Sequence, residues 1–195
     1  MSTDTSLDRK KAHAFEERLA GMLNDGALCL VISIGHRLGL FDLMGGGAPP
    51  GTSAAIAEGA GLNERYVREW LGAMVAGGIV TYDPKVKTYA LPAEHGAFLT
   101  RGGAEGNLAV YSQYIPLLGL VEDDILDCFK GGGGVPYDRF ARFHEVMAED
   151  SAETVLPALR DHILPLVPGL TKRLEEGIRV LDAGCGRGRA LNQMA

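Results

Sequence analysis

The feature that most constrains this chain is a glycine-rich segment close to its C-terminal end. Residues 179–188 read RVLDAGCGRG, an apolar run followed by the spacing Gly-x-Gly-x-Gly. Glycine lets a backbone turn sharply and approach a ligand closely, and a turn of this kind joins a strand to a helix in nucleotide-binding folds. We therefore expect a strand over 178–181, a ligand-binding turn, and a helix from Arg187 onward.

The spacing of the glycines and one carboxylate narrow the class of ligand that this turn can bind. A dinucleotide fingerprint requires Gly-x-Gly-x-x-Gly, but here the last position falls on Arg189 and the third glycine is Gly188. Asp182 lies at the end of the expected strand, where it would repel a pyrophosphate and attract an ammonium or a sulfonium. The pattern favours an adenosyl-amino-acid ligand over a nicotinamide cofactor, and a glycine-rich turn without any ligand is the alternative.

Helical periodicity dominates the N-terminal part of the chain. We expect one helix over Leu7–Asn24 and a second, more uniformly apolar helix over Gly26–Leu38. A helix that is apolar around much of its circumference must be covered on several sides. We therefore expect a homodimer formed through the N-terminal helices. The broad apolar face of the first helix carries Phe15, Leu19, Met22 and Leu23.

A helix-turn-helix and a β-ribbon are expected between residues 52 and 91. Thr52 or Ser53 can cap a short helix, and Asn63 can cap a longer helix over Glu64–Ala76. Two short strands follow, over Ile79–Tyr82 and Thr88–Leu91, with a turn between them. Helix, turn, helix and ribbon together indicate a winged helix.

The charge of this winged helix argues against a nucleic-acid partner. Four cations are balanced by four acids, namely Arg65, Arg68, Lys85 and Lys87 against Glu58, Glu64, Glu69 and Asp83. The whole chain has a net charge of -6. Phosphate neutralisation supplies most non-specific DNA affinity, so a neutral module on an acidic chain is a poor DNA reader. A structural role, in a dimer or beside a ligand site, is favoured over DNA binding.

Residues 180–188 resemble motif I of class I S-adenosylmethionine-dependent methyltransferases. Two further segments, 62–71 (LNERYVREWL) and 143–150 (FHEVMAED), resemble a bacterial branch of two-domain methyltransferases, some of which are labelled transcriptional regulators. The resemblance covers the front part of such an enzyme. It implies S-adenosylmethionine as cofactor, with Asp182, Gly184 and Gly186 against its methionine end. It also implies that Gly188 allows close packing and that Cys185 is a small residue of the turn.

The resemblance sets the expected organisation. The fold is expected to be mostly α, with a helical and winged-helix dimerisation domain (1–104), a helical linker or substrate lid (105–176), and the start of a truncated Rossmann-like α/β domain (177–195). Ribose- and adenine-binding residues would then lie beyond Ala195. The expected function is methylation of a small molecule by a fragment that is inactive alone. The alternative is a winged-helix regulator or a DNA- or protein-binding module.

The catalytic group is not identified by the sequence. Methyl transfer is mainly a matter of positioning, although a neutral acceptor can need a base. His144 is a candidate base and His162 a weaker one, and an ordinary surface or core histidine is the alternative for both. Tyr111 and Tyr114 flank Gln113 on a helix that could line a substrate cleft or simply pack.

Metal binding and membrane insertion are not expected. Cys29, Cys128 and Cys185 are far apart, so they have no metal-ligand spacing and suggest reduced thiols in a cytoplasmic protein. The longest apolar run, Ala27–Ile34, is too short to span a bilayer. Residues 1–10 lack the apolar region of a signal peptide.

Overall fold

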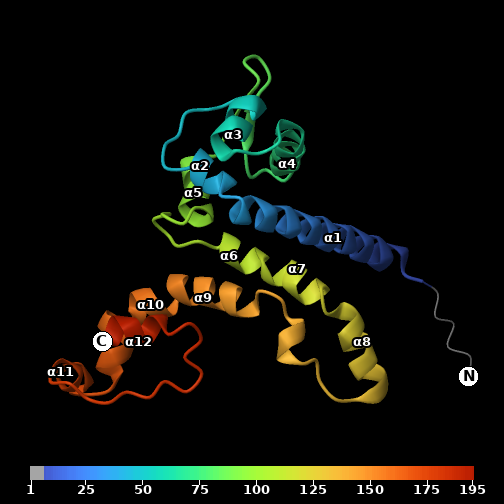
Figure 1. Ribbon diagram of the computed structural model, residues 1–195. Coiled ribbons are helices and arrows are strands. Elements are labelled where there is room, and N and C mark those ends of the chain that lie inside the picture. Colours follow the sequence, from blue (N-terminus) through green and yellow to red (C-terminus); the bar gives the residue numbers. More distant parts are fainter. Residues whose placement is uncertain (1–6) are drawn as a thin grey trace, which may run out of the picture. The chain divides into compact units, whose positions relative to one another are not determined.

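The computed structural model describes residues 7–195, and the chain divides into two compact units, Met1–Pro92 and Ala93–Ala195. Residues 1–6, which belong to the stretch without a signal-peptide pattern, lie outside the described part. The described residues are mostly helical, with one two-stranded antiparallel sheet (Figure 1). The expected mostly-α fold with a winged helix is confirmed, whereas the domain boundaries at 104 and 176 remain predictions.

One continuous helix replaces the two expected at the N-terminus. Glycine inside a helix costs only about 1 kcal/mol and keeps its backbone hydrogen bonds, so Gly26 does not interrupt the helix. Asp8 caps it by accepting hydrogen bonds from the backbone N–H groups of Lys10 and Lys11. The elements of the first unit are α1 (Arg9–Arg37), α2 (Leu40–Met44), α3 (Ser53–Ala60), α4 (Glu64–Ala76), β1 (Thr81–Asp83) and β2 (Thr88–Ala90).

The predicted caps of the helix-turn-helix are confirmed. The Thr52 hydroxyl accepts from the Ala55 N–H at 3.2 Å, and the Asn63 side chain accepts from the Arg65 N–H at 3.1 Å. Strand β1 begins two residues later than expected, because the N–H groups of Ile79 and Val80 bond back to the Met74 carbonyl at the end of α4.

The core of the first unit forms where α1 and α2 pack against α4. Trp70 is 5% exposed, donates its indole N–H to the Val31 carbonyl at 3.0 Å, and meets the Phe41 ring edge-on at 5.3 Å. Gly35 allows this approach, because a Cβ at this position would collide with the Trp70 ring. The other large side chains buried here include Leu40, Leu71 and Met74.

Within the described part of the first unit, the apolar face of the first half of α1 is not covered by other elements. Phe15, Leu19, Met22 and Leu23 are all exposed. Since α1 is continuous, it is long and apolar enough, by length and composition alone, to cross a membrane. A core helix of a soluble protein passes the same test, and α1 packs against both α2 and α4.

The second unit is a series of short helices. The elements are α5 (Ala93–Leu99), α6 (Ala109–Ser112), α7 (Tyr114–Gly119), α8 (Glu122–Gly131), η1 (Tyr137–Arg139), α9 (Phe143–Glu153), α10 (Val155–Ala158), η2 (Leu159–Ile163), η3 (Leu164–Leu166), α11 (Leu170–Glu175) and α12 (Arg189–Met194). Helix α9 contacts α6 and α10, and α12 contacts α10.

The prediction of a strand over 178–181 is wrong: in the described part of the chain this segment is not a strand. A strand needs a neighbour to satisfy its backbone N–H and C=O groups, and none of the described residues pairs with this segment. Leu181 is 92% exposed as a result. The helix that follows begins at Arg189 rather than Arg187, because Gly188 adopts a left-handed conformation at its cap.

Candidate functional site

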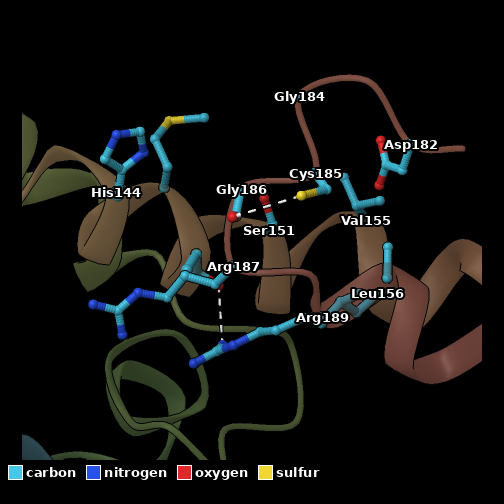
Figure 2. Close-up of a pocket in the computed structure, with 13 residues that line it drawn as sticks. His144, Ser151, Val155, Leu156, Asp182, Gly184, Cys185, Gly186, Arg187 and Arg189 are labelled. Carbon is cyan, nitrogen blue, oxygen red and sulfur yellow. Dashed lines mark hydrogen bonds between the residues drawn. The ribbon is translucent and has the colours of Figure 1, made fainter. Parts of the chain in front are cut away.

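The glycine turn and helix α9 enclose a cavity of about 250 Å³ within the second unit (Figure 2). Its wall comes from α9, α10, the loop before α12 and the first residues of α12. The lining residues are His144, Met147, Ala148, Ser151, Val155, Leu156, Asp182, Gly184, Cys185, Gly186, Arg187, Arg189 and Ala190. The structure therefore brings the candidate base into the same cavity as four of the five predicted cofactor residues.

The turn depends on glycine at all three positions of the spacing. Gly184, Gly186 and Gly188 have φ angles of +88°, +54° and +69°, in the left-handed region that L-residues with side chains rarely adopt. The Gly188 N–H donates to the Cys185 carbonyl at 2.8 Å and closes the turn. Gly188 does not line the cavity but is the N-cap of α12, and Cys185 is exposed.

Arg189 ties this turn to helix α9. Its guanidinium donates to the Ala148 carbonyl at 3.0 Å, across 41 positions of sequence (Figure 2). The contact holds the first residue of α12 against the helix that carries His144. Sequence reasoning missed this role, and the only signal was the position of Arg189 directly after the third glycine.

His144 lies on the rim of the cavity among aromatic rings. Its imidazole stacks on the Tyr137 ring with centroids 5.7 Å apart, and it meets Phe143 edge-on at 6.0 Å. None of the described residues forms a hydrogen bond with the imidazole, so nothing in this part of the chain selects one tautomer of the ring. His162 lies in η2 and does not line the cavity.

Behind the cavity wall, a polar network joins α9 to the junction of α6 and α7. Gln113 is 1% exposed, and its amide donates to Glu149 at 2.8 Å and accepts from Arg142 at 3.1 Å. Arg142 also donates to Glu145 at 2.8 Å, and Arg101 donates to the other oxygen of Glu149 at 3.3 Å. Every end of the Gln113 amide is engaged, so this side chain fixes α9 rather than contacting a ligand.

The two tyrosines beside Gln113 also pack against α9. The Tyr114 hydroxyl donates to Asp150 at 2.8 Å. Burial and this carboxylate raise the pKa of Tyr114 to about 12, and burial together with Asp150 also raises the pKa of Tyr111. Neither ring lines this cavity, and their place in a substrate cleft stays a prediction. Among residues 7–195, no cluster of three His, Cys, Asp or Glu side chains could hold a metal ion.

Residues 26–101 match the family model of the Rv2258c-like winged HTH domain. This stretch runs from the middle of α1 to just beyond α5 and contains the helix-turn-helix and the ribbon. No protein of curated function matches the sequence.

Several solved methyltransferase structures are similar to this chain. The N,N-8-amino-8-demethyl-D-riboflavin dimethyltransferase of Streptomyces davawensis is 22% identical, with a TM-score of 0.57 over 73% of this chain and 45% of that one. Mitomycin 7-O-methyltransferase is 19% identical, with a TM-score of 0.53 over 73% and 46%. Human N-acetylserotonin methyltransferase, in complex with S-adenosylmethionine, is 17% identical, with a TM-score of 0.54 over 78% and 46%.

These findings define the fold. Residues 26–101 form a winged helix-turn-helix domain, and the chain has the fold of one part of these methyltransferases. It spans less than half the length of each. The predicted resemblance to the N-terminal part of a two-domain methyltransferase is confirmed.

Proposed function

We propose that this chain belongs to an S-adenosylmethionine-dependent methyltransferase that acts on a small molecule. The observation that carries the proposal is the cavity that unites the glycine turn, Asp182 and His144. The fold shared with known methyltransferases supports it.

The chemistry of the cavity suits the amino-acid end of the cofactor. A carboxylate at Asp182 attracts an ammonium or a sulfonium, and the glycines leave the backbone open to close approach. The cavity, at about 250 Å³, is smaller than the roughly 300–1,000 Å³ of whole-ligand sites. It therefore fits one end of such a cofactor, and other walls would enclose the adenosine and the acceptor.

In the proposed reaction, the acceptor attacks the methyl carbon in line with the departing sulfur, and the protein supplies orientation. His144 contributes the one imidazole among the described residues of the cavity wall. It can accept the proton that a hydroxyl or amine acceptor loses. A homodimer through α1, which would cover the exposed Phe15 and Leu19, is part of the same proposal.

Cofactor binding tests the proposal. The complete encoded protein is titrated calorimetrically with S-adenosylhomocysteine, the product form of the cofactor. We expect Gly186→Val to weaken binding about ten-fold or more, because the side chain enters the cavity and strains a backbone at φ +54°.

The matched control is Gly131→Val, at the end of α8, where an added Cβ meets no atom within 4 Å and φ is not positive. It should leave the affinity unchanged. A wild-type protein without affinity for S-adenosylhomocysteine, or equal effects of the two variants, would contradict the proposal.

A DNA-binding regulator is the second candidate function, because the winged helix-turn-helix domain is present. The exposed face of α4 argues against it. Glu64 lies 3.7 Å from Arg68 and accepts from the Ser53 hydroxyl at 2.7 Å, so an acid offsets one of the two cations available to phosphate. Anisotropy titration of labelled duplex DNA at physiological salt tests this alternative, and tight sequence-dependent binding would favour it over catalysis.

A further inference from the structure

A groove lies within the first unit, between helices α1 and α4. Its volume is about 460 Å³, which falls within the roughly 300–1,000 Å³ of sites that hold a whole small molecule. Each helix contributes residues spaced three, four or seven positions apart, so each set lies on one helix face. The lining residues are Val31, Ile34 and Leu38 of α1, Tyr66, Val67, Glu69, Trp70 and Ala73 of α4, and Leu40, Leu62 and Asn63 between the two helices.

The α1 side of this groove is entirely apolar. Ile34 and Leu38 are exposed, and Val31 lies half-buried one turn before Ile34. An apolar ligand body that covers these side chains removes its own surface and theirs from water, which is the main favourable term of such binding. The groove therefore favours a ligand with a large hydrophobic body.

Two aromatic side chains of α4 line the opposite side. The Trp70 ring is held in place by its hydrogen bond to the Val31 carbonyl and its edge-on contact with Phe41. Tyr66 lies one turn earlier on the same face and is exposed. Trp and Tyr rings attract a cation that lies within about 6 Å of the ring centre, because the ring face is electron-rich.

Glu69 supplies the one charged side chain among the described residues of the groove. It makes no hydrogen bond or ion pair with any residue in 7–195, whereas Glu64, the other glutamate of α4, is engaged by Arg68 and Ser53. The carboxylate of Glu69 stands on the same helix face as the two aromatic rings. The charge of this otherwise apolar groove is therefore complementary to a cation.

We propose that the groove between α1 and α4 binds a hydrophobic organic cation. The positive group lies between the Glu69 carboxylate and the aromatic rings, and the apolar body covers Ile34 and Leu38. This inference is independent of the proposed function, because it concerns a different unit and a different ligand. Such a ligand contacts both helices and stabilises their packing by its binding free energy.

The test uses two probes of nearly the same shape and opposite charge, tetraphenylphosphonium and tetraphenylborate. Calorimetry measures both probes on the complete encoded protein and on the variants Glu69→Gln and Ala73→Phe. The first variant removes the charge, and the second places a ring in the groove. The matched controls are Glu58→Gln and Ala76→Phe, at exposed positions of the first unit that do not line the groove.

We expect the wild-type protein to bind the phosphonium about ten-fold or more tightly than the borate. Glu69→Gln should weaken phosphonium binding about five-fold, and it should narrow the difference between the probes. Ala73→Phe should weaken phosphonium binding about ten-fold or more, because its ring fills the groove. The two control variants should keep the wild-type affinities, and Glu58→Gln changes the net charge of the protein by the same amount as Glu69→Gln.

Four results would overturn the inference. Wild-type protein that binds neither probe has no such site, and equal affinity for the two probes would show that the groove does not select cations. Equal effects of Glu69→Gln and Glu58→Gln would remove the role of the Glu69 carboxylate, and this comparison holds even if Ala73→Phe does not fold. If light scattering shows that Ala73→Phe, but not Ala76→Phe, lowers the mass of the wild-type assembly, a second copy of the chain occupies the groove instead.

Discussion

Arg142 adopts a backbone conformation that its side chain must compensate. Its φ angle is +64°, and it directly precedes α9. A non-glycine residue in this region costs about 1–2 kcal/mol. The contacts of its guanidinium with Gln113 and Glu145 offset this cost and start α9 at a defined place.

Two substitutions at this position separate strain from contact. Both Arg142→Ala and Arg142→Gly lose the guanidinium, but only the glycine variant relieves the backbone. We expect the glycine variant to be more stable than the alanine variant by about 1 kcal/mol, with both below wild type. Urea denaturation measures the two free energies of unfolding. An alanine variant as stable as the glycine variant would contradict the claim that the backbone is strained at this position.

Tyr114 makes the second unit less stable at alkaline pH. Its pKa is raised from 10.0 to about 12 in the folded chain. The unfolded chain therefore loses this proton first, and the free energy of unfolding falls as pH rises from about 10 toward 12. Below pH 10 the full contribution is present.

The comparison is between wild type and Tyr114→Phe, which cannot ionise at this position. We expect the variant to be less stable at pH 8, by about 1 kcal/mol for the lost hydrogen bond to Asp150. It should also lose less stability than wild type between pH 10 and 12. Denaturant titrations at the three pH values test this, and parallel pH dependence in both proteins would refute the assignment.

At the scale of elements, the approach of α1 to α4 depends on one missing side chain. Trp70 lies where a Cβ on Gly35 would be. We expect Gly35→Ala to lower the free energy of unfolding by about 1–3 kcal/mol through overpacking. Gly21→Ala is the control in the same helix: its Cβ meets nothing within 4 Å, so it should stabilise by up to about 1 kcal/mol. Thermal denaturation, monitored by circular dichroism, distinguishes the loss of stability expected for Gly35→Ala from the gain expected for Gly21→Ala.

Local signals predicted the elements that local chemistry determines. The caps Thr52 and Asn63 and the bounds of α4 follow from residues a few positions apart. The strand at 178–181 could not be decided locally, because pairing needs a neighbour that sequence periodicity does not supply. The prediction of a break at Gly26 was wrong, because a single glycine weakens a helix without interrupting it.

Only the part of the candidate site whose residues lie close together in the sequence could be predicted. Asp182 and the glycines are read from one motif, and they do lie together. That His144 joins them, and that Arg189 ties their turn to Ala148, depends on how α9 packs against α12. Contacts between residues about 40 positions apart carry no periodic signal, and the Gln113 network was missed for the same reason.

At the scale of the whole molecule, the exposed face of α1 sets the expected assembly. Phe15 and Leu19 are 61% and 43% exposed on the face that we propose as a dimer interface. The double variant Phe15→Glu/Leu19→Glu should place charges in that interface and yield monomers. Light scattering after size-exclusion chromatography gives the mass.

The control for assembly is Val86→Glu, which changes an apolar residue that is 61% exposed between the strands of the ribbon. It should keep the wild-type mass. A wild-type protein that is already monomeric, or a double variant that stays dimeric, would rule out this interface.

Trp70 is the only tryptophan of the chain, and it is buried against α1 and Phe41 in the first unit. Its ultraviolet emission is therefore an intrinsic optical label for the winged-helix unit, to which the second unit contributes no indole signal. Backbone ellipticity, in contrast, sums the helices of both units. Recording the two signals in one denaturation experiment resolves the units without any added dye, and separate midpoints would show that each unit melts on its own.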